Sequence, residues 1–289
     1  MTLLQYEIFK EVIESGSFTK AGDKLGLTQS AVSHAIKSLE AELDLTLLKR
    51  GRSGVFLTFE GERILTYIRQ ILNLSEKLKQ EAGRLNGLEI GIIRIGTFPS
   101  VSSYLLPSII ERFHSMYPSI KVEFYEGGYH ELRHLIASGV IDIGFLTAEH
   151  TENLDFIPLF DDHLKVILPS SHPLKNEKQV SIHDIATEPF IMPKAGCDDL
   201  IKALFKTNNL RPNVYCEIAD NQTIIAMVQK NLGISIVPEI VMQTTRDLAT
   251  AELNEESFRT IGLALQNLNT VSPAVTAFIE LTKSMVDKK

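Results

Sequence analysis

Cysteine is scarce in this chain of 289 residues, which contains only Cys197 and Cys216. The two stand far apart and form no Cys-x-x-Cys spacing, so the sequence indicates neither a disulfide framework nor a thiolate zinc site. Because proteins of reducing compartments rarely carry disulfides, we expect a reduced, cytoplasmic protein.

Long hydrophobic runs are also missing. No apolar stretch approaches the roughly 18 residues that span a bilayer, and no basic start followed by an apolar run indicates a signal peptide. An apolar fraction of 44% with 22% charged residues is typical of a globular protein. We therefore expect no membrane partner, and the length predicts about two domains.

Common catalytic signatures are a third absence. The sequence has no Gly-x-Ser-x-Gly elbow, no Gly-x-x-x-x-Gly-Lys phosphate loop and no Gly-x-Gly-x-x-Gly fingerprint. These absences argue against the hydrolase, nucleotide-phosphate and dinucleotide classes that carry them. We expect no enzyme and no cofactor.

One segment does match a catalytic motif. Residues 130–134, HELRH, fit the zinc-protease pattern, with His130 and His134 as metal ligands and Glu131 as general base. Leu132 and Ile136 would form the buried stripe of the same helix, which turns both histidines outward, and no third ligand is apparent. A zinc metalloenzyme is therefore an alternative that rests on this segment alone, and we expect no metal.

Residues 1–58 are predicted to form short helices separated by tight turns. Gly16 ends a first helix, Ser17 is placed to cap a second, and Gly26 ends that one in turn. A third helix begins near Thr28, and two helices joined by so short a turn are typical of a helix-turn-helix. Residues 49–58, KRGRSGVFLT, combine turn residues with alternating apolar ones and predict a β-ribbon or wing.

The third helix, LTQSAVSHAIKSLE, has two different faces. Val32, Ile36 and Leu39 recur with helical spacing and predict a core-facing stripe. The opposite face carries hydroxyl, imidazole and ammonium groups, on Ser30, Ser33, His34 and Lys37. Because such groups can reach base edges and phosphates, we interpret this face as reading DNA. Residues 1–58 hold seven Lys or Arg and seven Asp or Glu. Contact with DNA must therefore depend on where the basic residues lie and not on their number.

Residues 59–86 predict one long helix with a heptad seam. Apolar residues step by four and three along it, with polar Ser75 among them, and a single helix cannot bury such a seam. We expect dimerisation through this helix, while packing of the seam on its own chain is the alternative. The residues assigned to dimerisation are Ile64, Ile68, Ile71 and Leu78.

From Leu88 the pattern becomes α/β. Strands and helices alternate in two rounds, which predicts two lobes with parallel sheets and a cleft between them. Pro273 is placed in the first turn of a last helix, after Ser272 as its cap.

Residues 17–50, SFTKAGDKLGLTQSAVSHAIKSLEAELDLTLLKR, closely resemble the N-terminal signature of the LysR-type transcriptional regulators. The later LTFEG, the long helix and the two lobes follow in that family's order, so the resemblance covers essentially the whole chain. It implies a winged helix-turn-helix over 1–58, a dimerising linker helix over 59–88 and a periplasmic-binding-protein-like effector domain over 89–289. Lobe one would comprise 89–162 and 267–289, and lobe two 163–266.

The same resemblance implies the partners. We expect a homodimer or homotetramer that binds a pseudo-palindromic promoter site in double-stranded DNA and a small-molecule effector in the cleft, and that contacts RNA polymerase if it activates. It places Gln29, Ser33, His34 and Lys37 towards DNA bases and Ser17, Ser30, Arg50 and Arg52 on phosphates. A solute-binding protein, the other alternative, would explain the lobes but leaves the first 86 residues unexplained.

The cleft residues are assigned from strand ends and helix starts. Thr97, Ser100 and Ser102 lie where backbone N–H groups favour an anionic ligand group, so we expect an anionic effector. On the facing lobe, a strand end and the next helix start supply Met192, Pro193, Lys194, Asn221 and Thr223. Capping of their own helices is the alternative role for the serines, and a surface position for Lys194.

Three positions depart from the family's pattern. Gly22 stands where a second alanine is usual, Leu48 where phenylalanine is common, and Glu60 where alanine precedes the wing glycine. A glycine inside a helix is expected to cost about 1 kcal/mol relative to alanine. All three positions concern packing and leave the chemistry of DNA contact unchanged.

Overall fold

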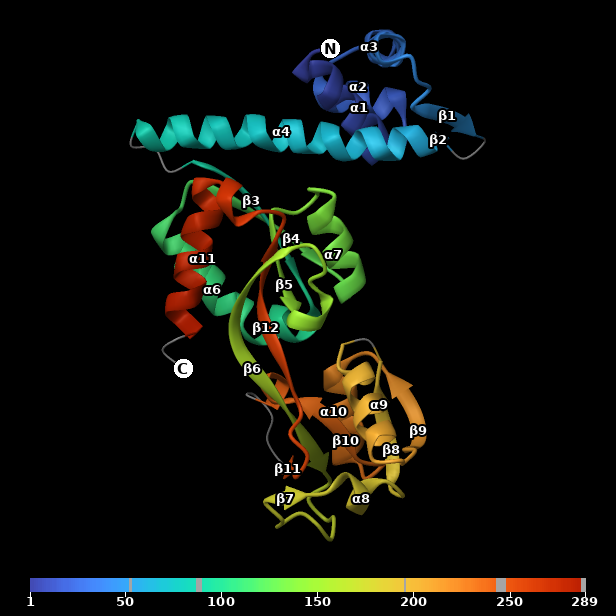
Figure 1. The fold of residues 1–289 in the computed structure, drawn as a ribbon, viewed down its shortest axis with the longest axis vertical. Coiled ribbons are helices and arrows are strands. Elements are labelled where there is room, and N and C mark those ends of the chain that lie inside the picture. The colour runs from blue at the N-terminus through green and yellow to red at the C-terminus, as the bar shows by residue number, and fades with distance from the viewer. Residues whose placement is uncertain (52–53, 87–89, 195, 243–247, 287–289) are drawn as a thin grey trace. The chain divides into compact units, whose positions relative to one another are not determined.

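The computed structural model describes residues 1–51, 54–86, 90–194, 196–242 and 248–286. The chain divides into two compact units (Figure 1). Unit 1 contains Met1–Gly91 with Ser138–Val140 and Val271–Pro273, and unit 2 contains the rest. Among the helices of the described segments, none is long and apolar enough to cross a bilayer.

Unit 1 begins with the predicted helices and ribbon. Thr2, Ser17, Thr28 and Thr58 cap successive helices, each accepting a hydrogen bond from a backbone N–H in the first turn. The elements are α1 (Leu3–Ser15), α2 (Phe18–Leu25), α3 (Gln29–Leu43), β1 (Leu48–Gly51), β2 (Gly54–Leu57) and α4 (Phe59–Leu85). The predicted helix-turn-helix and wing are therefore present.

The core of unit 1 joins all four helices. Phe9, Val32 and Leu39 are fully buried in it, which confirms the apolar stripe expected for the third helix. Leu48 packs partly buried against the same cluster, and Glu60 lies in the first turn of α4, where a negative charge is favourable.

Gly22 has a structural reason that the sequence did not reveal. A Cβ at this position would lie 2.6 Å from the backbone oxygen of Leu27, and the Leu27 N–H donates to the Gly22 oxygen over 2.8 Å. The turn into α3 thus packs directly on the α2 backbone. The expected gain from alanine is wrong here, because the side chain has no room.

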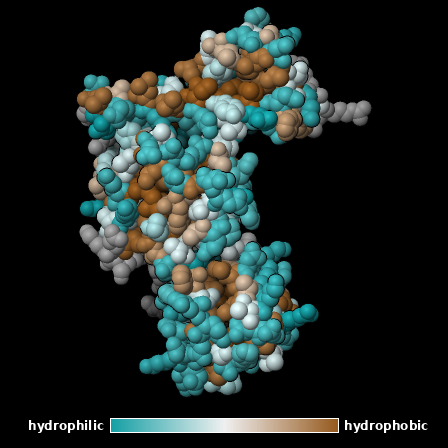
Figure 2. All heavy atoms as spheres, in the orientation of Figure 1, coloured by the Kyte–Doolittle hydropathy of each residue, from teal (hydrophilic) through white to brown (hydrophobic). Residues whose placement is uncertain are grey.

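Helix α4 carries two apolar stripes instead of one seam. Ile68 is 2% exposed and Ile64 packs partly buried, both in the core of their own chain, so assigning them to dimerisation is corrected. A second stripe about 100° away around the helix is exposed, and Figure 2 shows hydrophobic residues gathered along α4. This exposed stripe consists of Tyr67, Ile71, Leu74, Leu78 and Leu85.

Lobe one of unit 2 surrounds one end of a mixed sheet. The sheet order is β4-β3-β5-β12-β6-β11-β7, with β10 also paired to β6. β3 and β5 are parallel, as expected, whereas β12 runs antiparallel to β5. Lobe one contains β3 (Gly91–Thr97), α5 (Pro99–Tyr104), α6 (Leu106–Met116), β4 (Ile120–Glu126), α7 (Tyr129–Ala137), β5 (Ile143–Thr147), η1 (Ala148–His150) and α11 (Pro273–Val286).

Two long strands connect the lobes. The first part of β6 (Asp155–Leu168) pairs with β12 (Phe258–Leu265), and its second part pairs with β10 and β11 of lobe two. Since β12 also pairs with β5, it belongs to lobe one as well. The sequence-based division places β12 in lobe two, and its pairing with β5 shows that this strand is shared by both lobes.

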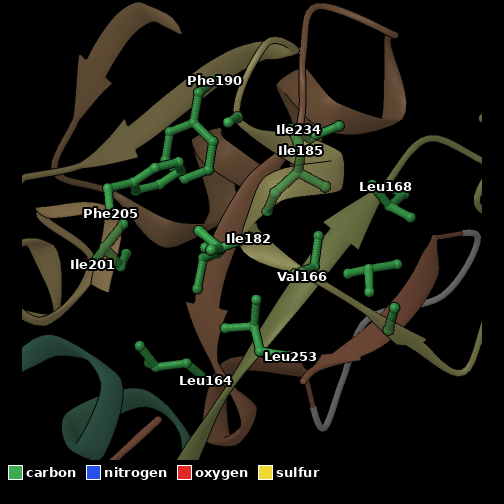
Figure 3. Packing of buried hydrophobic residues seen from close by; sticks show 14 of the residues in the cluster. Leu164, Val166, Leu168, Ile182, Ile185, Phe190, Ile201, Phe205, Ile234 and Leu253 are labelled. Carbon is green, nitrogen blue, oxygen red and sulfur yellow. The ribbon is translucent and has the colours of Figure 1, made fainter. Parts of the chain in front are cut away.

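Lobe two packs around its own hydrophobic core. Phe190 and Phe205 meet edge to face with ring centroids 5.5 Å apart, in the same cluster as Ile182 and Val166 (Figure 3). The elements are β7 (Gln179–Val180), α8 (Ile182–Ile185), β8 (Pro189–Pro193), α9 (Asp198–Thr207), β9 (Asn213–Ile218), α10 (Asn221–Gln229), β10 (Ser235–Pro238), η2 (Glu239–Met242) and β11 (Ala249–Leu253). This core holds the ends of β8 and α9 at the surface facing lobe one.

Candidate functional site

The polar face of α3 is free of the core. The apolar stripe anchors the helix, so Gln29, His34 and Lys37 are exposed while Ser33 is half-buried. Ser30 is also exposed, with its Oγ 3.0 Å from the Thr28 Oγ1. Hydroxyl, amide, imidazole and ammonium groups are therefore presented together along one helix, a set able to bond base edges and phosphate oxygens.

Some lysines of unit 1 that lie outside α3 already form ion pairs with glutamates of the same unit. Lys24 pairs with Glu11 over 2.9 Å, and Lys10 lies 3.8 Å from Glu14. For Lys37 no ion pair is recorded within the described segments. The balanced charge of residues 1–58 thus leaves Lys37 available to an anionic partner.

The wing is tied to α3 by one carboxylate. Glu40 Oε1 accepts hydrogen bonds from the N–H groups of Leu47 and Leu48, over 2.7 and 3.1 Å, at the start of β1. Arg50 lies on β1, while Arg52 falls outside the described residues. Ser17 caps α2 by accepting from the Lys20 N–H, so its predicted phosphate contact would have to share the hydroxyl.

A pocket in unit 2 lies between the two lobes. Its volume is about 440 Å³, which is within the range that holds a small organic ligand. α5, α7 and η1 line it from lobe one, and β8, α9 and α10 from lobe two. The structure therefore has the cleft that the two-lobed pattern predicts.

Half of the predicted effector residues line this pocket. Ser100, Pro193, Lys194 and Asn221 do so. The other four do not line it: Thr97 is buried and bonded to Ser102, Met192 belongs to the core of lobe two, and Thr223 bonds Asp220, the cap of α10. Their contact with an effector stays a prediction. Strand ends and helix starts located the pocket, but the direction of each side chain depended on packing.

Arg259, which lines the pocket, and its partner Asp162 were missed because they come from the connecting strands. Arg259 of β12 is 2% exposed, and its Nε and Nη2 donate to Asp162 Oδ2 of β6 over 3.0 and 2.7 Å. Its Nη1 donates to the Tyr129 hydroxyl over 2.7 Å, and its Nη2 also donates to Ser100 Oγ over 2.9 Å. Burial raises the pKa of Asp162 in spite of the nearby guanidinium. Arg259 is the single charged residue of the otherwise mostly apolar strand β12, and this was a signal that the sequence offered.

Aromatic and imidazole rings form one wall. Tyr129 packs against His150 with centroids 4.5 Å apart, and His130 meets His150 edge-on at 5.5 Å. His150 Nδ1 lies 2.7 Å from Thr147 Oγ1. Burial, reinforced by His130, lowers the pKa of His150, so the ring stays neutral to lower pH than a free histidine.

The HELRH segment forms the start of α7. His130 and Glu131 line the pocket, whereas His134 is exposed. Within the described residues no three His, Cys, Asp or Glu side chains are grouped to hold a metal ion. Cys197, also at the pocket, is buried, and burial raises the pKa of its thiol to about 11.

Comparison with known proteins covers both units. The family model described as bacterial regulatory helix-turn-helix protein, lysR family, matches residues 3–62, and the LysR substrate binding domain matches 86–287. The chain is 35% identical over 289 residues to the uncharacterized HTH-type transcriptional regulator YvbU of Bacillus subtilis, covering 99% of each.

Solved structures share the architecture. A full-length OxyR variant from Pseudomonas aeruginosa superposes with a TM-score of 0.81 at 21% identity, covering 99% of this chain and 94% of that one. Full-length CbnR in complex with its target DNA gives a TM-score of 0.59 at 21% identity, covering 99% and 100%. Both likenesses concern the fold.

Proposed function

Because this chain belongs to the LysR family of DNA-binding transcriptional regulators with a ligand-binding domain, we propose that α3 and the wing read an inverted-repeat site and that a small molecule in the inter-lobe pocket changes this binding. Residues 1–58 would bind DNA, 59–88 would dimerise and 89–289 would bind the effector. As its partner is chromosomal DNA, we propose that it acts in the cytoplasm.

The observation that carries the DNA-binding role is the division of α3 into two faces. Val32, Ile36 and Leu39 are buried, while Gln29, His34 and Lys37 are exposed. The amide, imidazole and ammonium groups of the exposed residues can form hydrogen bonds with a partner. Insertion into a major groove uses such a face, and phosphate contacts by neighbouring residues would orient it.

Symmetry of the DNA site follows from a dimer. The exposed stripe of α4 supports pairing with a second copy, because five large apolar side chains gather along one side of a single helix. A homodimer would present two copies of α3 to successive major-groove turns, which requires a pseudo-palindromic site. The proposal also includes pairing of dimers into tetramers. It includes contact with RNA polymerase if the protein activates transcription.

The pocket's charges argue against a simple anionic effector. Lys194 and Arg259 line it, but so do Glu131, Asp198 and Asp199, and Asp162 pairs with Arg259. An anion entering the pocket would lose its hydration without finding an uncompensated buried cation. We therefore do not extend the sequence-based expectation of an anionic ligand to this site.

Neither alternative role explains both units. A solute-binding protein would not need a winged helix-turn-helix with an exposed reading face. The absence of a metal-ligand cluster within the described residues leaves the zinc-enzyme hypothesis with only His130 and Glu131 at the pocket. We propose no catalytic activity.

The test is retention of sheared genomic DNA from the source organism, followed by sequencing of the retained fragments. At about 150 mM salt, non-specific binding is weak, so specific sites should be enriched. We expect a few inverted-repeat sites for the native chain and loss of enrichment for Lys37→Ala. Lys24→Ala is the matched control, because this lysine is already paired with Glu11.

An absence of enriched sites, both with and without cell extract to supply effector, would refute the proposal. Enrichment that Lys37→Ala leaves intact would refute the assignment of α3 alone.

A further inference from the structure

The buried end of the pocket is built around one guanidinium. Arg259 is 97 residues from Asp162 in sequence, and all four of its hydrogen bonds to side chains span 97 to 159 residues of chain. Its guanidinium also lies over the Phe98 ring, 5.2 Å from the centroid. With Asp162 as its carboxylate partner, the group carries no net charge.

The direction of these hydrogen bonds determines what the pocket offers. An arginine only donates, so the hydroxyl oxygens of Tyr129 and Ser100 must accept from Arg259. Each hydroxyl then keeps its own hydrogen, and within the described residues no acceptor is recorded for either hydrogen. Accepting from a cation also polarises a hydroxyl and makes it a stronger donor. Burial raises the pKa of Tyr129, which keeps this proton in place.

The rest of the lining suits an uncharged molecule. Pro99, Pro193 and Pro238 provide apolar surface beside the ring wall of Tyr129 and His150. Asp198 is paired with Lys202 over 2.7 Å, and Asp199 and Glu131 place further negative charge around the cavity. The carboxylates of Asp199 and Glu131 would repel an anion in this cavity.

We propose, on the basis of the effector pocket inferred above, that its ligand is an uncharged compound with a planar or compact apolar body and a carbonyl-type oxygen, which accepts hydrogen bonds from Ser100 and Tyr129. Arg259 is a positioning residue that orients and polarises both hydroxyls. Asp162 keeps that end of the pocket neutral and so excludes carboxylates.

Benzamide and benzoate test this preference, because they share ring, size and carbonyl oxygen and differ in charge. Binding to the full-length protein is measured by ligand-observed NMR titration at neutral pH. We expect benzamide to bind at least about tenfold more tightly than benzoate, which corresponds to about 1.4 kcal/mol. Ser100→Ala and Tyr129→Phe should each weaken benzamide binding about fivefold or more, as loss of one hydrogen bond does. Ser103→Ala, on the exposed side of α5, is the control.

The Asp162→Asn variant distinguishes a role of Asp162 and Arg259 in ligand preference from a role in supporting the fold alone. This variant leaves the Arg259 charge uncompensated, so the benzamide-to-benzoate affinity ratio should move towards benzoate by about tenfold. Damage to the pocket would weaken both probes together and leave their ratio unchanged. The double variant Asp162→Asn with Arg259→Gln restores neutrality and should restore the preference for benzamide, with lower affinity.

Tighter binding of benzoate by the native chain would overturn the proposal, as would a ratio that Asp162→Asn does not move. Failure of both probes to bind would refute the assigned ligand class. These results are distinguishable from failure of the proposed function, because retention of specific DNA sites is measured without either probe.

Discussion

Gly22 lies inside α2, where alanine would ordinarily be the better helix former. The Leu27 oxygen is 2.6 Å from where a Cβ would be, so backbone contact outweighs helix propensity at this residue. We expect Gly22→Ala to lower the free energy of unfolding by about 1–3 kcal/mol, the usual cost of overpacking. Thermal unfolding checks this, with Gly128→Ala as control because a Cβ there meets nothing within 4 Å. A stabilised Gly22→Ala variant would contradict the close contact.

Cys197 differs from Cys216 in its surroundings. The Cys197 thiol is buried, which raises its pKa to about 11, whereas Cys216 is half-buried on β9. Because the thiolate is the reactive form, we expect the native chain to react rapidly with DTNB at one thiol at most, and the Cys216→Ser variant at none until it unfolds. Rapid labelling of native Cys216→Ser would show that Cys197 is accessible and ionised.

His150 should make stability depend on pH. Burial holds the pKa of His150 below the ordinary histidine value of 6.5, so the native state binds fewer protons than the unfolded state as pH falls below that value. Stability contributed by neutral His150 is therefore present above about 6.5 and is lost on acidification. We expect His150→Gln to flatten the fall of unfolding free energy between pH 7 and about 5.5. Urea denaturation measures it, and His134→Gln, at an exposed position, should keep the native slope.

Among the elements, α4 shows most clearly that residues with the same sequence spacing can have different roles in the tertiary structure. Ile64 and Ile68 follow the same heptad spacing as Ile71 and Leu78, so periodicity alone assigned all four to one seam. The three-dimensional core of unit 1 takes up the first two and leaves the others exposed. A seam residue can be assigned only once the neighbours that cover it are known.

The exposed stripe of α4 predicts the effect of a single charge. Leu78 is 71% exposed in the isolated chain, so Leu78→Asp should leave the fold intact and, by burying an unpaired charge, shift the proposed dimer to a monomer. Size-exclusion chromatography with light scattering reports the mass, and circular dichroism the helicity. Lys79→Asp, about 100° around the helix, should remain dimeric. An unchanged mass for Leu78→Asp would remove this stripe from the interface. Ile68→Asp is unsuitable because it would disrupt the core.

The connecting strands β6 and β12 show the opposite case, in which the sequence pattern gives little sign of the element. The alternation of strands and helices in the sequence did not reveal that β6 and β12 are shared by both lobes. β6 contains Pro158 and the acidic pair Asp161 and Asp162, and β12 changes register between Ile261 and Gly262. β6 pairs with three strands and β12 with two, and the stability that these neighbours supply does not show in the periodicity of a single sequence.

At the scale of the whole molecule, the net charge has the same sign as DNA, the expected partner. The chain has a formal net charge of −7, while residues 1–58 balance seven basic and seven acidic side chains. Specific DNA binding must therefore depend on a few placed cations. We expect a shallow slope of log affinity against log salt, reduced by about one further unit per subunit in Lys37→Ala. Fluorescence anisotropy across a salt series measures it. A steep slope that is insensitive to Lys37 would indicate a phosphate contact surface elsewhere.

The sequence by itself determined what depends on neighbours within a few residues. Capping hydroxyls at Ser17 and Thr28, turns at Gly16 and Gly26 and the buried stripe of α3 follow from local hydrogen bonding and helical period. These features established the helix-turn-helix, and with it the family resemblance.

Only the tertiary structure decided which side chains form the ligand pocket and which apolar residues of α4 remain exposed. Arg259 and Asp162 meet because the pairing of β6 with β12 places them directly opposite each other, although 97 residues separate them in sequence. Contacts of this kind depend on strand order and core packing, to which every part of unit 2 contributes. For that reason the polarity of the buried end of the pocket, and the ligand class inferred from it, followed from the fold and not from a motif.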